Sequence, residues 1–200
     1  MVGRILIHGR SVAMIMALFL VSACSLLDKS ARVETPVYDL GPGQFVWLPE
    51  RAQNGPVEIV VSLASQRAWV FRSGTLIGTS SVSSGRRGYE SPIGRFEILQ
   101  KRKVHSSNRY ENAPMPYMQR LNWYGVAFHG GKVPGYPASH GCIRLPMQFA
   151  EKLYDVTRLG SFVFVADRAL RSPDEALRLA RANINAPMGP ERRRASGGAG

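Results

Sequence analysis

Cys142 is the residue of this sequence best suited to nucleophilic attack on a carbonyl carbon, because a cysteine thiolate is a strong nucleophile. A free thiol with a pKa of about 8.5 is largely protonated at neutral pH, so this chemistry needs a base or a positive charge nearby. The segment Ser139-His140-Gly141-Cys142-Ile143-Arg144-Leu145 and the upstream Phe128-His129-Gly130 contain both kinds of group. These residue types predict covalent acyl-transfer catalysis at Cys142.

His129 is expected to be the general base, with His140 in a supporting role. His129 lies at the end of a predicted strand, and a loop that folds back can bring its imidazole to the thiol. The glycines and prolines that follow His129 suit such a loop. His140 lies two positions before Cys142 and is expected to tune the thiolate or to shape the turn.

Gly141, directly before the nucleophile, is expected to help build an oxyanion hole. Glycine has no Cβ, so it permits unusual dihedrals and a close approach of substrate to the backbone. The amides at and before Cys142 can then point at the carbonyl oxygen as it becomes anionic.

Other uses of Cys142 are open at this level. The chain has two cysteines, and Cys142 can be a buried structural residue or the partner of Cys24 in a disulfide. His129, His140 and Cys142 would offer three metal ligands, but no Cys-x-x-Cys or His-x-x-x-His spacing supports zinc. Neither a metal nor a cofactor is expected.

Residues 139–145, with the upstream His-Gly, resemble the catalytic signature of the L,D-transpeptidase catalytic domain, also called the YkuD domain. In that signature a His-Gly is followed, after a variable gap, by Ser-His-Gly-Cys, an apolar residue, and Arg or Asn. The segment Ser91-Pro92-Ile93-Gly94-Arg95-Phe96 is similar to the family's Thr-Pro-x-Gly-x-Phe turn, and Gln66 and Val70 add weaker support. The resemblance covers residues 57–167.

This resemblance implies an enzyme of peptidoglycan. Cys142 would attack the carbonyl of the third residue of a stem tetrapeptide, release the terminal D-Ala, and pass the acyl group to an amine. A stem amine gives a 3-3 crosslink, and a lysine of an envelope protein gives a wall-anchored protein. A peptidoglycan hydrolase or carboxypeptidase with the same thiol, and a non-catalytic wall-binding lipoprotein, are the alternative functions.

The residues expected to contact substrate lie around both parts of the signature. Ser139 and Gly130 belong to it, and the resemblance implies that Arg144 orients the site or faces a substrate carboxylate, with a surface ion pair as the alternative. Tyr117 and Met118 end an apolar, proline-bounded segment, residues 112–118. This segment is expected either to cover a bound peptide as a flap or to pack in the core.

Short runs of β-branched and aromatic residues, separated by turn residues, predict a domain that is mainly β. Strands are expected at residues 57–63, 68–71, 76–82, 95–100, 123–129 and 161–166. Pro146 favours a helix over 146–158, and Ser172 with Glu175 is typical of a capping box that opens a second helix, to about residue 184. With the resemblance, this predicts a β-sandwich or barrel-like L,D-transpeptidase fold with one or two packed helices.

The N-terminus is typical of an exported protein. Arg4 and Arg10 precede an apolar stretch too short to span a bilayer comfortably, and Val21-Ser22-Ala23-Cys24 resembles a bacterial lipobox. Residues 1–23 are expected to be a removed signal peptide and Cys24 to be acylated, with type I signal peptidase cleavage as the alternative. By resemblance to lipoproteins, Ser25 favours the periplasmic face of the outer membrane.

Composition divides the rest of the chain. Proline and glycine predict a flexible tether over residues 24–55, before the catalytic domain at 56–167. Residues 168–200 are expected to hold a C-terminal helix and a disordered basic tail.

The formal net charge of +12 favours an anionic partner. The basic residues are scattered, and their dense run, residues 192–194, lies in the Gly-rich tail, so nucleic acid is not expected as a partner. The expected partners are peptidoglycan stem peptides, envelope proteins as acyl acceptors, and a membrane that holds the lipid anchor.

Overall fold

The computed structural model of the protein describes residues 39–110 and 112–189. The chain divides into two units, residues 1–34 and 35–200, and every described residue belongs to the second. The predicted signal peptide, Cys24 and the basic run 192–194 lie outside the described residues. Within the described part of the chain, no helix is long and apolar enough to cross a bilayer.

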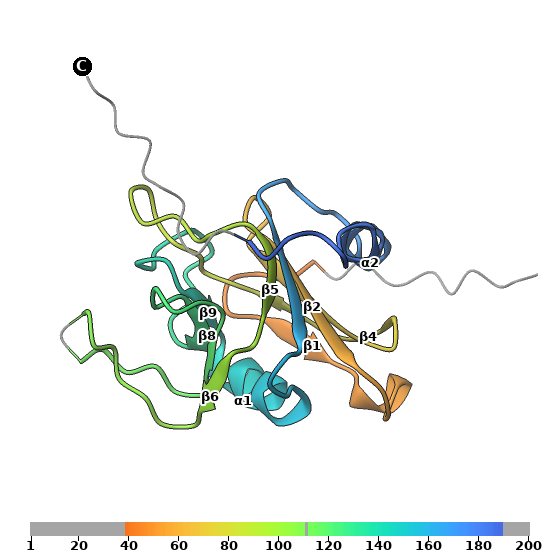
Figure 1. Ribbon diagram of the computed structural model, residues 1–200, viewed down its shortest axis with the longest axis horizontal. Coiled ribbons are helices and arrows are strands. Elements are labelled where there is room, and N and C mark those ends of the chain that lie inside the picture. The colour runs from red at the N-terminus through yellow and green to blue at the C-terminus, as the bar shows by residue number, and fades with distance from the viewer. Residues whose placement is uncertain (1–38, 111, 190–200) are drawn as a thin grey trace, which may run out of the picture. The chain divides into compact units, whose positions relative to one another are not determined.

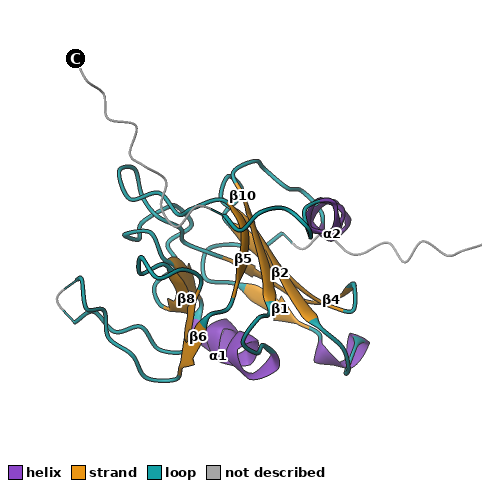
Figure 2. Ribbon diagram, in the orientation of Figure 1, coloured by secondary structure: helices purple, strands orange, loops and turns teal. Residues whose placement is uncertain are grey.

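In the described residues ten strands form two sheets, which confirms the prediction of a mainly β fold with one or two packed helices (Figures 1 and 2). In the larger sheet, of order β1-β4-β3-β2-β10-β5, only β2 and β10 run parallel to each other. Its strands are β1 (Phe45–Trp47), β2 (Val57–Ser62), β3 (Arg67–Arg72), β4 (Thr75–Ser81), β5 (Gly94–Glu97) and β10 (Phe162–Ala166). The smaller sheet has the order β6-β7-β8-β9, with β8 and β9 parallel. It consists of β6 (Gln100–Arg102), β7 (Met118–Arg120), β8 (Ala127–Gly130) and β9 (Ile143–Leu145).

Helices α1 (Met147–Val156) and α2 (Pro173–Ala182) begin where the sequence predicts them, and a short 3-10 helix, η1, spans Pro49–Arg51. At the start of α2, Ser172 Oγ accepts a hydrogen bond from the Glu175 amide at 3.2 Å, as the capping pattern predicts. The Glu175 carboxylate accepts a hydrogen bond from the amide of Arg171 at 2.9 Å, whereas a capping box would use the amide of Ser172.

The two faces of β2 explain the layers of the fold. Ile59 and Val61 pack in a core shared with strands of the smaller sheet and with Phe149 of α1. Val60, which points to the opposite face, packs in a second cluster with Ala176 and Ala180 of α2. Burial of each large apolar side chain contributes about 1.5–3 kcal/mol to the stability of the fold, so both faces of β2 are stabilising.

The predicted tether is too long. Its residues Phe45, Val46 and Trp47 form β1, the edge strand that pairs with Ser80, Thr79 and Gly78 of β4. Trp47 also packs edge-on against Phe149, with 5.5 Å between ring centroids. The proline and glycine content of this segment does not reveal a strand whose pairing and ring contacts are made by tertiary structure.

The predicted disordered tail also starts too early. Met188 bridges to Arg95 of β5, and the Gly189 amide donates to the Arg95 carbonyl at 2.6 Å. Residues 186–189 therefore pair with an edge strand whose hydrogen-bonding groups would otherwise face solvent.

Candidate active site

The alternation of side chains along β8 and β9 assembles the candidate site. His129 lies opposite Arg144, and Phe128 lies opposite Ile143. Phe128 and Ile143 are fully buried in the core. Because successive residues of a strand point to opposite faces, His129 and Arg144 share the other face, and Cys142, directly before β9, lies on that face too.

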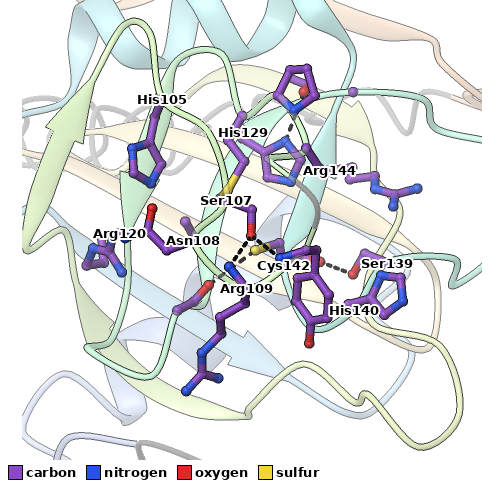
Figure 3. A pocket seen from close by; sticks show the side chains of 18 of the residues that line it. His105, Ser107, Asn108, Arg109, Arg120, His129, Ser139, His140, Cys142 and Arg144 are labelled. Carbon is purple, nitrogen blue, oxygen red and sulfur yellow. Dashed lines mark hydrogen bonds between the residues drawn. The ribbon is translucent and has the colours of Figure 1, made fainter.

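A cavity of about 410 Å³ opens on this face (Figure 3). It brings together most of the residues predicted for the site: Cys142, His129, His140, Arg144, Ser139 and Gly130. Cys142 itself is a free, half-buried thiol.

Tyr117 and Met118, which were predicted as substrate contacts, do not line this cavity. Met118 is fully buried and packs with Met115 and Ala127, and Cys142 contacts this cluster. Tyr117 points to α1, where its hydroxyl donates to Glu151 Oε1 at 2.7 Å. The apolar character that suggested a flap reflects packing below the thiol.

Much of the cavity wall comes from a long loop between β6 and β7, residues 103–117, of which the sequence analysis singled out only the segment 112–118. Backbone bonds join Met115 to His105 and Tyr117 to Lys103, so the loop is a paired extension of the two strands. The described loop residues that line the cavity are His105, Ser107, Asn108, Arg109, Tyr110, Ala113, Pro114 and Met115. The length of this segment and its lack of a periodic pattern could have indicated a functional loop, since long loops of this kind often carry function.

Ser139 and Gly141 fix the shape of the nucleophile segment. Ser139 Oγ accepts from the Gly141 amide at 3.0 Å and donates to the carbonyl of Cys142. Gly141 has a φ of +114°, which favours glycine, while a Cβ there would come no closer than 3.6 Å to other atoms. The glycine is therefore needed for its dihedral rather than for space. Gly141 does not line the cavity, and its amide is already engaged.

The segment is held from below by Gln66 and Ser84. Gln66 Nε2 donates to Ser84 Oγ at 2.7 Å, and its Oε1 accepts from the Ser84 amide at 2.9 Å. The Ser84 carbonyl in turn accepts from the amides of Ala138 and Ser139, both at 3.0 Å. This pattern assigns a positioning role to Gln66, which the sequence analysis named only as weaker support for the family resemblance.

His129 is 8% exposed, and its ring nitrogens have distinct roles. Nδ1 lies 2.9 Å from the Gly130 carbonyl, which can only accept, so Nδ1 carries the hydrogen and Nε2 is the basic nitrogen. Burial is the main cause that lowers the pKa of His129, and the Gly130 bond opposes it. Arg144 and His105 lower this pKa further, so the imidazole is neutral and able to accept a proton.

The Cys142 thiol donates to the Gly125 carbonyl at 3.4 Å. Burial raises the pKa of Cys142, against smaller lowering effects of the Ala127 amide, Arg144 and Arg120. In the described part of the chain, no hydrogen bond joins the thiol to His129 or His140. Burial therefore favours the neutral form of both the thiol and the imidazole.

His140 is exposed and is held between two aromatic rings. Its ring stacks on Tyr110 with 4.4 Å between centroids and meets Tyr89 edge-on at 4.8 Å. Burial, Arg86 and Arg144 lower the pKa of His140. This placement fits a residue that joins the 103–117 loop to the nucleophile segment.

The residues that the structure describes contain no group of three or more His, Cys, Asp and Glu side chains that could hold a metal ion. The side chains of the site suit acid-base and nucleophilic chemistry, with one thiol, the imidazoles of His105, His129 and His140, and several cations.

The profile of the YkuD L,D-transpeptidase catalytic domain matches residues 56–165. The chain belongs to this family. No curated protein sequence matches the chain.

Solved L,D-transpeptidases share the fold of this L,D-transpeptidase-family chain. The enzyme from Stackebrandtia nassauensis is 28% identical with a TM-score of 0.53, and the match covers 61% of this chain and 60% of that one. The enzyme from Mycobacterium smegmatis is 23% identical, with a TM-score of 0.53 and coverage of 58% and 60%. LdtMt1 in complex with imipenem is 25% identical, with a TM-score of 0.51 and coverage of 55% and 58%. The chain thus spans less than two thirds of each of these proteins.

Proposed function

We propose that this protein is a peptidoglycan L,D-transpeptidase that works through a thioester at Cys142. The observation that carries the proposal is the placement of Cys142 and His129 on one face of adjacent parallel strands, in one cavity, within the family match. The donor is a stem tetrapeptide, and the attacked carbonyl belongs to its third residue.

The first half-reaction needs the thiol to leave the Gly125 carbonyl and give its proton to His129 Nε2. The sulfur then attacks the donor carbonyl, and the Cys142 amide is the nearest candidate donor to the developing oxyanion, because the Gly141 amide bonds Ser139 Oγ. Collapse of the tetrahedral intermediate breaks the peptide bond, and the leaving D-Ala amine takes the proton from His129. A thioester and free D-Ala result.

In the second half-reaction His129 accepts a proton from an attacking amine and returns it to the departing Cys142 sulfur. The acyl group ends on a neighbouring stem or on a lysine of an envelope protein. If water attacks instead, the same thioester gives the hydrolase or carboxypeptidase outcome.

The decisive experiment is incubation of the mature protein with disaccharide tetrapeptide, followed by mass spectrometry of protein and products. We expect release of D-Ala, a thioester adduct on the wild type, and a 3-3 dimer. No adduct should form on the Cys142→Ala variant. Binding of peptidoglycan without any product would instead identify a non-catalytic wall-binding protein.

Carbapenem acylation gives an independent test of the nucleophile. LdtMt1 was solved with imipenem, so we expect imipenem to add to Cys142 in this protein too. Intact-protein mass spectra should gain one adduct in the wild type and none in Cys142→Ala. An unmodified wild type, or an equal adduct on both, would contradict the assignment of Cys142.

We further propose that residues 1–23 are a signal peptide, that Cys24 is lipidated, and that the protein works at the periplasmic face of the outer membrane. The lipobox-like residues 21–24 and Ser25 support this location. Such an anchor would hold the catalytic domain beside its wall substrate and beside envelope proteins with acceptor lysines.

A further inference from the structure

The side chains around the cavity have an uncompensated positive charge. Four cations line it, Arg109, Arg120, Lys132 and Arg144, and its described lining residues include no Asp or Glu. Arg120, Lys132 and Arg144 form no ion pair with any carboxylate in residues 39–110 and 112–189. Unpaired cations at a half-enclosed site favour an anionic ligand.

The strand register places Arg120 on the same face as the nucleophile. Arg120 lies opposite Ala127 across β7 and β8. Ala127 is level with Cys142, since the next residues, Phe128 and Ile143, are paired. Arg120, Ala127 and Cys142 therefore form a row across neighbouring strands, with about 10 Å between the outer backbones. The middle side chain is only a methyl group, so Ala127 itself does not separate the guanidinium from the thiol.

Local contacts hold the Arg120 side chain in place at the cavity. Its Nε donates to Gln100 Oε1 at 2.9 Å, and its guanidinium carbon lies 5.7 Å from the centroid of the Trp123 ring. This leaves the terminal nitrogens available for a two-pronged contact with a carboxylate. Figure 3 shows Arg120 and Arg144 on opposite sides of Cys142. Both lower the pKa of the thiol, so both lie within electrostatic reach of it.

We propose that Arg120 forms a carboxylate-binding subsite beside the thiol, which selects donor peptides with a free carboxylate within about one residue of the attacked carbonyl. The row of about 10 Å supports the limit of one residue. One residue of extended peptide spans about 3.5 Å, and the arginine side chain spans the rest of the distance to the thiol. The inference rests on the proposed function and names its substrate class: acidic, non-amidated stems. The carboxylate has two sources, the C-terminus of the leaving residue and the side chain of a diamino diacid at the third position.

Binding to the full mature chain carrying Cys142→Ala separates recognition from chemistry, since Arg120 also affects the reactivity of the thiol. The probes are three synthetic tetrapeptides: one with all carboxylates free, one amidated at its C-terminus, and one amidated on the third side chain. We expect calorimetry to give at least tenfold weaker binding for one amide, which identifies the recognised carboxylate. With the added R120Q substitution, acid and amide should bind within about twofold of each other.

Two variants serve as controls. R120K keeps the charge without the fork and should give an intermediate ratio between acid and amide. R158Q removes an exposed arginine that does not line the cavity, so it should keep the full ratio. Near-ultraviolet circular dichroism checks that R120Q is folded.

The possible failures are distinguishable. An acid-to-amide ratio that R120Q leaves unchanged, or that R158Q reduces equally, would overturn the subsite, even where the wild type forms a thioester with the free-acid peptide. A wild type that none of the three peptides acylates would overturn the proposed function, and the subsite with it.

Discussion

Cys142 and His129 favour their neutral forms for the same physical reason. Both side chains are withdrawn from water, and burial disfavours a charged form, so the pKa of the thiol is raised and that of the imidazole is lowered. A resting thiolate and imidazolium are therefore not expected. Proton transfer to Nε2 becomes part of catalysis, when substrate displaces the thiol from the Gly125 carbonyl.

The raised pKa predicts slow alkylation of Cys142 by a small thiol reagent at neutral pH. The thiolate fraction rises with pH, so the rate should climb to a midpoint above the ordinary cysteine value of about 8.5. R144Q removes a cation that lowers this pKa and should shift the midpoint upward, whereas R158Q should not. A rate already at its plateau at pH 7 would contradict the neutral pair.

Acylation by imipenem should distinguish the two histidines. His129→Gln keeps much of the side-chain volume but removes the basic nitrogen, so acylation should fall by about 10² or more. His140→Ala should retain more activity and lose about 1 kcal/mol of stability with the ring contacts to Tyr110 and Tyr89. The measurements are adduct formation against time by mass spectrometry and thermal unfolding. A larger loss of acylation in His140→Ala would reverse the assignment.

At the scale of elements, sequence patterns predicted the segments with strong local character. Runs of β-branched residues predicted β2 and β10, and Pro146 predicted α1 at its observed start. The predicted strand 123–129 is wrong in its first half, since Asn122 Oδ1 accepts from the amides of Tyr124 and Val126 and folds these residues into a turn. Strand propensity does not reveal that a side-chain oxygen competes for the backbone amides that a strand would use.

The residues of the site also divide into those that the sequence predicts and those that only the tertiary structure reveals. Cys142 and His129 were predictable because reactive residue types stand in a specific pattern. Arg120, His105 and Tyr110 were not, since only the pairing of β6 with β7 brings their segment to the cavity. Register across a sheet is a tertiary property, and no local spacing encodes it.

The turn before β3, which bonds the loop after β4, predicts a role for Gln66 in positioning the nucleophile. Gln66→Ala removes three side-chain hydrogen bonds, to Leu63 and to two atoms of Ser84, and should cost about 1–3 kcal/mol of unfolding free energy. Because Ser84 holds the amide of Ser139, imipenem acylation should slow as well.

Gln53→Ala is the matched control, since Gln53 is exposed and lies far along the chain from these loops. Chemical denaturation and adduct formation should both be unchanged in this control. A Gln66→Ala variant with lower stability but the wild-type acylation rate would limit the residue to a structural role.

At the scale of the whole molecule, the proposed function would bring a basic protein to an anionic wall. The formal charge is +12 for the full chain and 12 − 2 = +10 once Arg4 and Arg10 are removed with residues 1–23. This charge would raise the local concentration of carboxylate-bearing polymer, but screening at physiological ionic strength limits the attraction to about 8 Å. Charge would therefore act only over a short range, and the proposed lipid anchor would supply the longer-range attachment.

We predict that Cys24 is lipidated. Cys24 directly follows Val21-Ser22-Ala23 and the apolar stretch that starts at Val12, which is the arrangement that a lipoprotein signal requires. In the wild type, mass spectrometry of the mature N-terminus should find an acylated cysteine, and the protein should fractionate with the outer membrane. Cys24→Ala should be released in soluble form or remain unprocessed, whereas Cys142→Ala, which loses the other thiol, should stay with the membrane. A Cys24→Ala protein that is correctly cleaved and still sediments with the membrane would show that basic charge or another contact, and not a lipid, holds the protein there.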